Sequence, residues 1–135
     1  MSFELVEDDA AVNADLLARF DADNPRRGPW DRTTFSLVRR DDGGRVAAGV
    51  RGILNMGAVE IRTLWVDEGL RGQGIGAALL AAVEAEAKRR GATLARLDTY
   101  DWQAQPFYES RGYRPFAAFD FPAGARQVWL EKELG

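Results

Sequence analysis

The feature that most constrains the fold is the stretch from Leu64 to Arg90. It begins with an apolar run that ends at Val66, and a glycine cluster at residues 72–76 then opens an alanine-rich segment. In that segment apolar residues recur at a spacing of four, which places them on one face of a helix. Gly91 follows three basic residues, a pattern typical of a helix C-terminus. The stretch therefore predicts a strand, a glycine-rich turn and a helix.

The glycine-rich turn predicts a site for an anion. The first turn of a helix has backbone N–H groups without intrahelical partners, and the helix dipole adds partial positive charge there. Glycines at positions 72, 74 and 76 let a phosphate approach closely, because no Cβ lies in the way. A tight turn alone is the alternative, but three glycines at alternate positions favour a phosphate site.

Two well-known nucleotide loops fit this turn poorly. The P-loop requires a lysine after its last glycine, and no lysine stands there. The dinucleotide fingerprint G-x-G-x-x-[G/A] is matched formally by Gly72, Gly74 and Ala77. That match lies in the middle of the chain, without a clear βαβ unit around it, so a dinucleotide site remains only an alternative.

The turn resembles a different motif. Arg71-Gly72-Gln73-Gly74-Ile75-Gly76 is similar to the [R/Q]-x-x-G-x-[G/A] signature of the GNAT superfamily of N-acetyltransferases, and Leu64-Trp65-Val66 resembles that family's fourth strand. The resemblance covers residues 58–115 and implies acetyl-CoA as cosubstrate. It implies that backbone amides of the turn hold the pyrophosphate and that the backbone of residues 64–66 pairs with the pantetheine arm. The residues predicted to bind the cofactor are Leu64, Trp65, Val66, Arg71, Gly72, Gln73, Gly74, Ile75, Gly76, Ala77 and Asp101.

A second motif, from Asp101 to Tyr113, resembles the family pattern N-x-x-A-x-x-[LF]-Y-x-x-x-G-[FY]. The resemblance implies that Tyr108 is the acid that protonates the leaving thiolate. A phenol with a pKa near 10 stays protonated at neutral pH, as that role requires. Asp101 stands where the family has an asparagine that contacts the cofactor arm, and an anionic side chain could contact the amine instead.

The chain has no cysteine and no histidine, which excludes Cys nucleophiles, thiolate zinc sites and every mechanism that needs a Ser-His or Cys-His pair. Acid–base chemistry must therefore come from other groups or water. The amine must lose a proton, and the thioester oxygen needs a donor, for which we expect the N–H near Val66. Glu60 is the candidate base, with Asp98 and Asp101 as second choices. An ordinary surface carboxylate is the alternative interpretation of Glu60.

Length and charge limit the other possibilities. A chain of 135 residues with 46% hydrophobic residues predicts one domain, residues 1–135, with a buried core. Its net charge of −3 argues against general binding to nucleic acid or anionic membranes. No apolar run is long enough to span a membrane, and the acidic N-terminus does not resemble a signal peptide. The cytoplasm is the predicted location.

The remaining periodicities predict a mixed α/β fold of the GNAT kind, with a central, mostly antiparallel sheet of six to seven strands flanked by helices. Within the strand 58–66, alternation places Val59, Ile61, Thr63 and Trp65 on one face. The family usually has two helices after its first strand, and a loop at residues 24–30 stands in place of the second. The predicted strands are 3–6, 33–39, 45–54, 58–66, 93–99, 112–121 and 127–132, and the other predicted helices are 10–20, with Asp8 or Asp9 as cap, and 101–110.

These motifs predict an N-acetyltransferase that moves an acetyl group from acetyl-CoA to a primary amine of a small molecule or peptide, by direct attack in a ternary complex. The alternative is an acyl-CoA-binding module without catalysis. Arg26, Arg27 and Trp30 could face an acceptor that carries an acid group, although a solvated loop explains them equally well. The closing strand pair is a candidate edge for a homodimer.

Overall fold

The described chain, residues 1–25 and 30–135 of this computed structural model, forms two compact units. The N-terminal unit, Met1–Trp30, contains the predicted first helix as α1 (Ala10–Asp23). The carboxylate of Asp9 caps α1 by accepting the backbone N–H groups of Ala11 and Val12 at 2.9 and 3.1 Å. The predicted strand at residues 3–6 is wrong, because none of the described strands pairs with that segment and Phe3 is 88% exposed. Arg26 and Arg27 lie outside the described residues.

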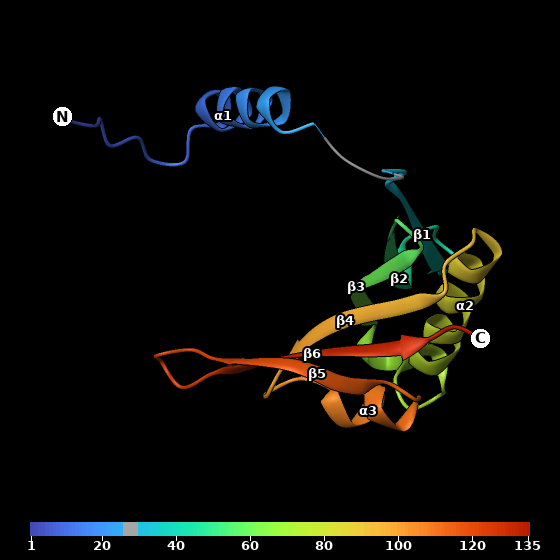
Figure 1. Ribbon diagram of the computed structural model, residues 1–135. Coiled ribbons are helices and arrows are strands. Elements are labelled where there is room, and N and C mark those ends of the chain that lie inside the picture. The colour runs from blue at the N-terminus through green and yellow to red at the C-terminus, as the bar shows by residue number, and fades with distance from the viewer. Residues whose placement is uncertain (26–29) are drawn as a thin grey trace. The chain divides into compact units, whose positions relative to one another are not determined.

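The larger unit, Asp31–Gly135, is built on one six-stranded sheet in the order β1-β2-β3-β4-β6-β5 (Figure 1). All neighbouring strands are antiparallel except β3 and β4, which are parallel. This topology confirms the predicted mixed sheet. Its elements are β1 (Thr33–Arg40), β2 (Val46–Asn55), β3 (Ala58–Val66), a 3₁₀ turn (Glu68–Leu70), α2 (Ile75–Arg89), β4 (Leu94–Tyr100), α3 (Gln105–Ser110), β5 (Arg114–Asp120) and β6 (Arg126–Glu133).

Helix α2 covers the three-stranded half of the sheet formed by β1, β2 and β3 (Figure 1). Its buried side chains, Leu80, Val83 and Ala87, recur at helical spacing and join the core that includes Val59 and Leu97. On β2, Gly52 has a packing role, because a Cβ at this position would lie 2.8 Å from the ring of Phe35. None of the described helices is long and apolar enough to cross a membrane.

Strand β3 contains a β-bulge that the sequence pattern did not predict. Arg62 pairs with Arg51 and Trp65 pairs with Gly49, so two residues of β3, Thr63 and Leu64, lie opposite one residue of β2. Thr63 takes a φ of 55°, which is unusual for a β-branched residue. The predicted alternation is therefore wrong beyond the bulge. Val59 and Ile61 are buried, whereas Thr63 and Trp65 are exposed.

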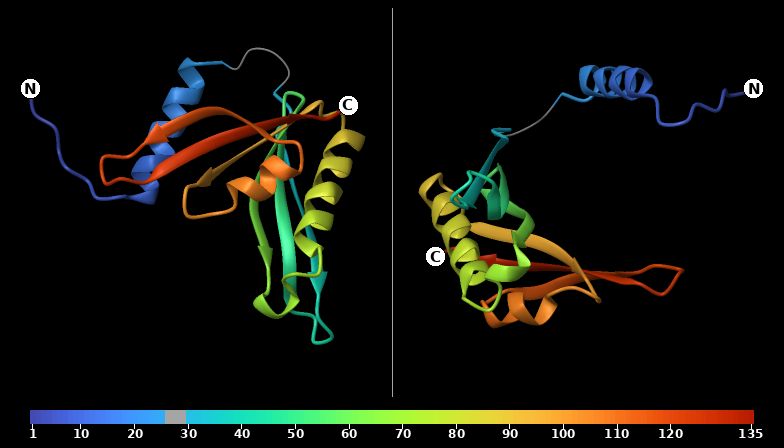
Figure 2. Two further views of the ribbon diagram at one scale, coloured as in Figure 1. Left: turned by 90° about the horizontal axis from the view of Figure 1, so that it is seen from below. Right: turned by 180° about the vertical axis from the view of Figure 1, so that it is seen from behind.

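The parallel seam between β3 and β4 is short. Only three residue pairs join the two strands, from Ala58 with Leu94 to Glu60 with Arg96. Beyond these pairs the strands diverge (Figure 2), although β3 continues to Val66 and β4 to Tyr100. The sheet thus consists of two three-stranded halves that separate on one side of the seam.

Helix α3 begins later than expected. The sequence predicts a helix at residues 101–110, but residues 101–103 form a turn and the helix starts at Gln105. The side-chain oxygen of Gln103 accepts the backbone N–H of Tyr100 at 2.9 Å, which closes the turn at the end of β4. This local hydrogen bond competes with helix formation at the same residues.

Candidate active site

The glycine-rich turn has the geometry of an anion site. Gly72 and Gly74 have φ values of 79° and 80°, in the left-handed region where glycine is favoured. Gly74 is the N-cap of α2, and no side chain caps the helix there. A Cβ added at either glycine would meet nothing within 4 Å, so conformation and not crowding requires glycine. The first N–H groups of α2 therefore lie at an end of the helix that is not covered by a capping side chain.

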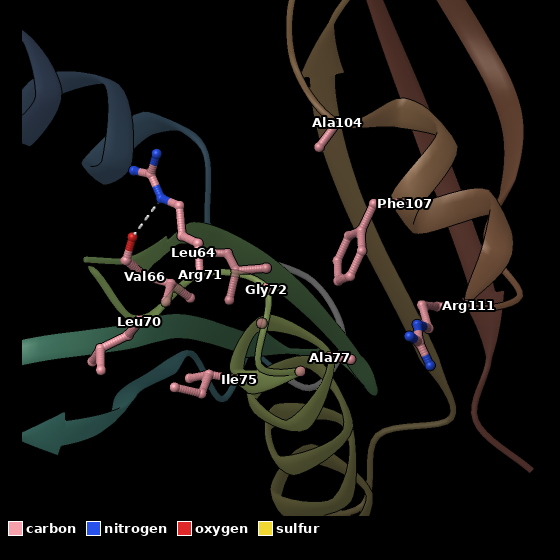
Figure 3. A pocket seen from close by; sticks show the side chains of 12 residues that line it. Leu64, Val66, Leu70, Arg71, Gly72, Ile75, Ala77, Ala104, Phe107 and Arg111 are labelled. Carbon is pink, nitrogen blue, oxygen red and sulfur yellow. Dashed lines mark hydrogen bonds between the residues drawn. The ribbon is translucent and has the colours of Figure 1, made fainter. Parts of the chain in front are cut away.

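A cavity of about 450 Å³ lies beside this turn, and we name it the glycine pocket (Figure 3). Its walls come from the end of β3, the turn, the start of α2 and the region of α3. The side chains of Phe107 and Arg111 lie across the cavity from the turn. The lining residues are Leu64, Val66, Leu70, Arg71, Gly72, Gly74, Ile75, Gly76, Ala77, Ala104, Phe107 and Arg111. Most of the residues predicted to bind the cofactor are thus brought together in one place.

Arg71 is held beside the turn by two contacts. Its Nε donates to the backbone oxygen of Val66 at 2.9 Å, as drawn in Figure 3, and its guanidinium lies 4.9 Å from the centre of the Trp65 ring. Arg111 supplies a second cation on the opposite wall, where its guanidinium lies 5.8 Å from the centre of the Phe107 ring. Two positive charges therefore flank a mostly apolar cavity next to a helix N-terminus, which suits a ligand with phosphate groups and an apolar arm.

Three residues predicted to bind the cofactor do not line the glycine pocket: Trp65, Gln73 and Asp101. The Trp65 side chain lines a separate cavity, and its Nε1 donates to Asp67 at 2.8 Å. The backbone N–H of Asp101 donates to the oxygen of Arg126 at 2.9 Å.

Beyond the seam, one backbone edge of β3 faces the gap between the diverging strands β3 and β4. The N–H of Asp67 donates to the backbone oxygen of Ala47, the second residue of β2, at 2.8 Å. Because consecutive residues of a strand direct their backbone groups to opposite sides, the N–H and C=O of Val66 point away from β2. The bond from Arg71 to the Val66 oxygen agrees with this orientation.

A second cavity, of about 300 Å³, lies on the other side of Leu64, and we name it the tyrosine pocket. Its lining residues are Ile61, Arg62, Thr63, Leu64, Leu97, Asp98, Tyr100, Gln103 and Tyr108. Leu64, which the bulge displaces, lines both pockets. Burial raises the pKa of the Tyr108 phenol, and the nearby negative charge of Asp98 raises it further. Tyr108 therefore stays protonated at neutral pH.

The two candidate carboxylates occupy different environments. Asp98 lines the tyrosine pocket, and one of its oxygens accepts the side-chain N–H of Gln127 at 2.8 Å. Glu60 does not line that pocket and is only 12% exposed, because Arg62 bonds it at 2.8 Å and Arg96 lies 3.9 Å away. The hydrogen bond and charge of Glu60 raise the pKa of Arg62, which does line the pocket.

The sequence motifs missed several lining residues. Arg111 stands directly before the motif glycine Gly112, but the motif leaves its position unspecified. Arg62 is the last residue of β3 that pairs with β2 before the bulge, and neither sequence motif includes its position. The one signal that could have found Arg62 is its place two residues after Glu60, on the same face of the strand.

The comparisons with known proteins agree with this geometry. Residues 6–113 match the acetyltransferase (GNAT) family. Blasticidin-S acetyltransferase of Streptomyces morookaense is 39% identical over 67% of this chain and 68% of its own length. An acetyltransferase of Agrobacterium fabrum is 34% identical over 81% of this chain and 80% of its own.

A solved structure from Agrobacterium tumefaciens aligns with 98% of this chain and 99% of its own, at a TM-score of 0.82 and 33% identity. These three proteins are therefore 33–39% identical to this chain over the aligned residues, and the solved structure also shares its fold. The chain belongs to the GNAT family of acetyltransferases.

Proposed function

We propose that this protein transfers the acetyl group of acetyl-CoA to a primary amine of a small molecule or peptide, by direct attack in a ternary complex. One observation carries the proposal. The strands β3 and β4 pair over only three residues, and beyond this seam two pockets share Leu64: one is lined by the glycine-rich turn, the other by a tyrosine and a carboxylate. The same gap can therefore admit a long phosphate-bearing cosubstrate and a separate cationic acceptor.

The glycine pocket fits coenzyme A by its chemistry. The N–H groups at the start of α2, which no side chain caps, suit the pyrophosphate, and Arg71 and Arg111 add positive charge at the walls. The apolar lining and the open backbone edge of β3 suit the pantetheine arm, which carries amide groups that can pair with a strand. Proteins of the GNAT family use acetyl-CoA, and the chemistry of these residues supports the same cosubstrate here.

Two groups of this chain would assist at the reacting carbonyl. The N–H of Val66 points into the gap and would donate to the oxyanion that forms when the amine attacks. The Tyr108 hydroxyl would give its proton to the departing thiolate, and its raised pKa keeps that proton in place until it is needed. Both roles depend on the sulfur lying near Leu64, where the two pockets meet.

The geometry favours Asp98 over Glu60 as the carboxylate that faces the acceptor. Asp98 lines the pocket, whereas Glu60 is engaged by Arg62. We therefore assign Asp98 to hold the ammonium group and to accept its proton, directly or through water. Glu60 remains the second candidate for the base. Its contact with Arg62 also gives it a role in positioning the Arg62 side chain.

The test combines binding with turnover. Calorimetry should show that acetyl-CoA binds to the protein and that NAD and ATP do not. Release of free thiol should then require an added amine, from a panel that includes blasticidin S because a relative carries that name. Tight binding without thiol release for any amine would instead support an acyl-CoA-binding module. Absence of acetyl-CoA binding would refute the proposal as a whole.

A further inference from the structure

A group of aromatic side chains adjoins the tyrosine pocket, which Tyr100 also lines, and we name Tyr100, Trp102, Phe119 and Phe121 the aromatic cluster. The rings of Tyr100 and Trp102 are stacked, with centroids 4.7 Å apart and planes 16° apart. Phe121 lies 6.1 Å from Tyr100 and 4.8 Å from Phe119. Four rings from two separate segments of the chain thus form one continuous surface.

The cluster is open to solvent. Trp102 is 67% exposed, Phe119 57% and Phe121 37%. Large aromatic side chains gathered on the surface commonly mark a site of interaction. The stacking of Tyr100 on Trp102 also fixes the orientation of both rings, so a planar ligand would meet a platform that is already ordered.

The cluster is continuous with the tyrosine pocket. Tyr100 is a member of both. In the sheet, Tyr100 of β4 and Phe119 of β5 both lie opposite Gln127 of β6, so the three side chains share one face. Asp98 lies two residues before Tyr100 on the same face and accepts the hydrogen bond of Gln127. A carboxylate and an aromatic platform are therefore neighbours on one surface.

We propose that the aromatic cluster binds the acceptor, and that the acceptor is an amine whose chain carries a planar aromatic or heteroaromatic ring. The ammonium group would lie at Asp98 and the ring would stack on Trp102 and the phenylalanines. The charge of Asp98 is complementary to an ammonium ion, and ring faces attract both planar rings and cations. This inference rests on the proposed acetyl transfer and narrows its substrate class.

The test compares two amines with the same side chain but different rings: 2-phenylethylamine carries a planar aromatic ring, and 2-cyclohexylethylamine carries a puckered saturated ring. Hydrophobic burial alone would not favour the phenyl compound, so a preference for it reports stacking. In calorimetry with coenzyme A present, we expect the phenyl compound to bind about 3- to 10-fold more tightly. Trp102→Leu should remove that preference, and Tyr100→Leu should act in the same direction.

Phe116→Leu is a matched control, because Phe116 lies on β5, the strand that also carries Phe119 of the aromatic cluster. Phe116 is 49% exposed on β5 but lines a different cavity, with Pro115 and Val128. Phe116→Leu should therefore keep the preference for the phenyl compound. Equal binding of the two amines, binding of neither, or a preference that survives both Trp102→Leu and Tyr100→Leu would overturn the inference.

Two further measurements separate the alternatives. Sedimentation that reveals a dimer lost in Trp102→Leu but kept in Phe116→Leu would show that the cluster is a subunit interface, and would overturn the inference. Thiol release measured with the same amines separates this inference from the proposed function. A ring preference in binding without thiol release would refute acetyl transfer alone, whereas thiol release without a ring preference would refute the ring site alone.

Discussion

The glycine pocket and the tyrosine pocket meet at Leu64 but are built in opposite ways. The glycine pocket depends on backbone conformation, because its key positions, Gly72 and Gly74, contribute N–H groups and no side chain. The tyrosine pocket depends on side chains from separate elements, such as Arg62 of β3, Asp98 of β4 and Tyr108 of α3. The glycine pocket should therefore tolerate many changes of side chain but few changes of backbone conformation. The tyrosine pocket should tolerate changes of backbone conformation better than changes of side chain.

The largest effect is expected in the tyrosine pocket. Tyr108→Phe removes the proton donor but keeps the ring that packs against the core, so kcat should fall by about 1,000-fold. The dissociation constant of acetyl-CoA should stay within about twofold, because the glycine pocket is unchanged. Steady-state kinetics and calorimetry would check both values, and a similar loss of binding would contradict the separation of the two pockets.

The pH profile of the wild-type enzyme tests the same group. Burial and the charge of Asp98 both raise the pKa of Tyr108, so its protonated form persists above the ordinary value of about 10. The rate should therefore show no loss from this group between pH 7 and about 10. An alkaline limb below pH 9 that vanishes in Tyr108→Phe would contradict the raised pKa.

The next effect separates the two carboxylates. Asp98→Asn should lower kcat/KM by about 100-fold, because the ammonium loses its anionic partner and its proton acceptor. Glu60→Gln should cost about 10-fold or less, through misplacement of Arg62. A pH–rate profile for each variant identifies the base by the loss of the acidic limb. If the larger effect and the lost limb belong to Glu60→Gln, the assignment of Asp98 is wrong.

A smaller effect is expected in the glycine pocket. Gly74→Ala forces a Cβ into a left-handed residue and into the space before the helix, so acetyl-CoA should bind about 10-fold more weakly. Gly91→Ala is the matched control, since Gly91 has a φ of 99° and equally open surroundings at the other end of α2. Both variants should lose roughly 1 kcal/mol of stability in urea unfolding. Only Gly74→Ala should weaken binding in calorimetry.

The smallest effect concerns the bulge between the pockets. Thr63 has a φ of 55°, which costs a β-branched residue about 1–2 kcal/mol. Thr63→Gly relieves this strain but adds chain entropy to the unfolded state, so the net gain should be about 1 kcal/mol or less. Urea unfolding measures the change. A clear loss of stability would show that the threonine side chain holds the bulge in place.

The two pockets also differ in how far the sequence predicted them. The turn at residues 72–77 is contiguous, and left-handed glycines before a helix have a readable spacing, so most of the glycine pocket was predicted. The tyrosine pocket joins residues far apart in the chain, and its shape depends on the bulge at Thr63 and Leu64. The alternation of side chains along a strand gives no sign of one extra residue. The alternation predicted for residues 58–66 therefore ignores the bulge.

Other differences arise where a local pattern needs a partner. The apolar segment at residues 3–6 has the composition of a strand, but strands are stabilised by neighbours and the described chain gives it none. The strand pairs of the larger unit were predicted to within about two residues, because glycine turns such as that at Gly44 define their ends. The proposal of a single domain over all 135 residues stays a prediction.

The short seam between β3 and β4 has a consequence for amide hydrogen exchange and for handling of the protein. Past Glu60 and Arg96 the two facing strand edges lack ladder partners in the described chain, so their amides should exchange faster than those at the seam. Unpaired strand edges also promote self-association. A ligand that pairs with these edges would slow their exchange and suppress aggregation. Purification in the presence of coenzyme A should therefore yield more monodisperse protein than purification without it.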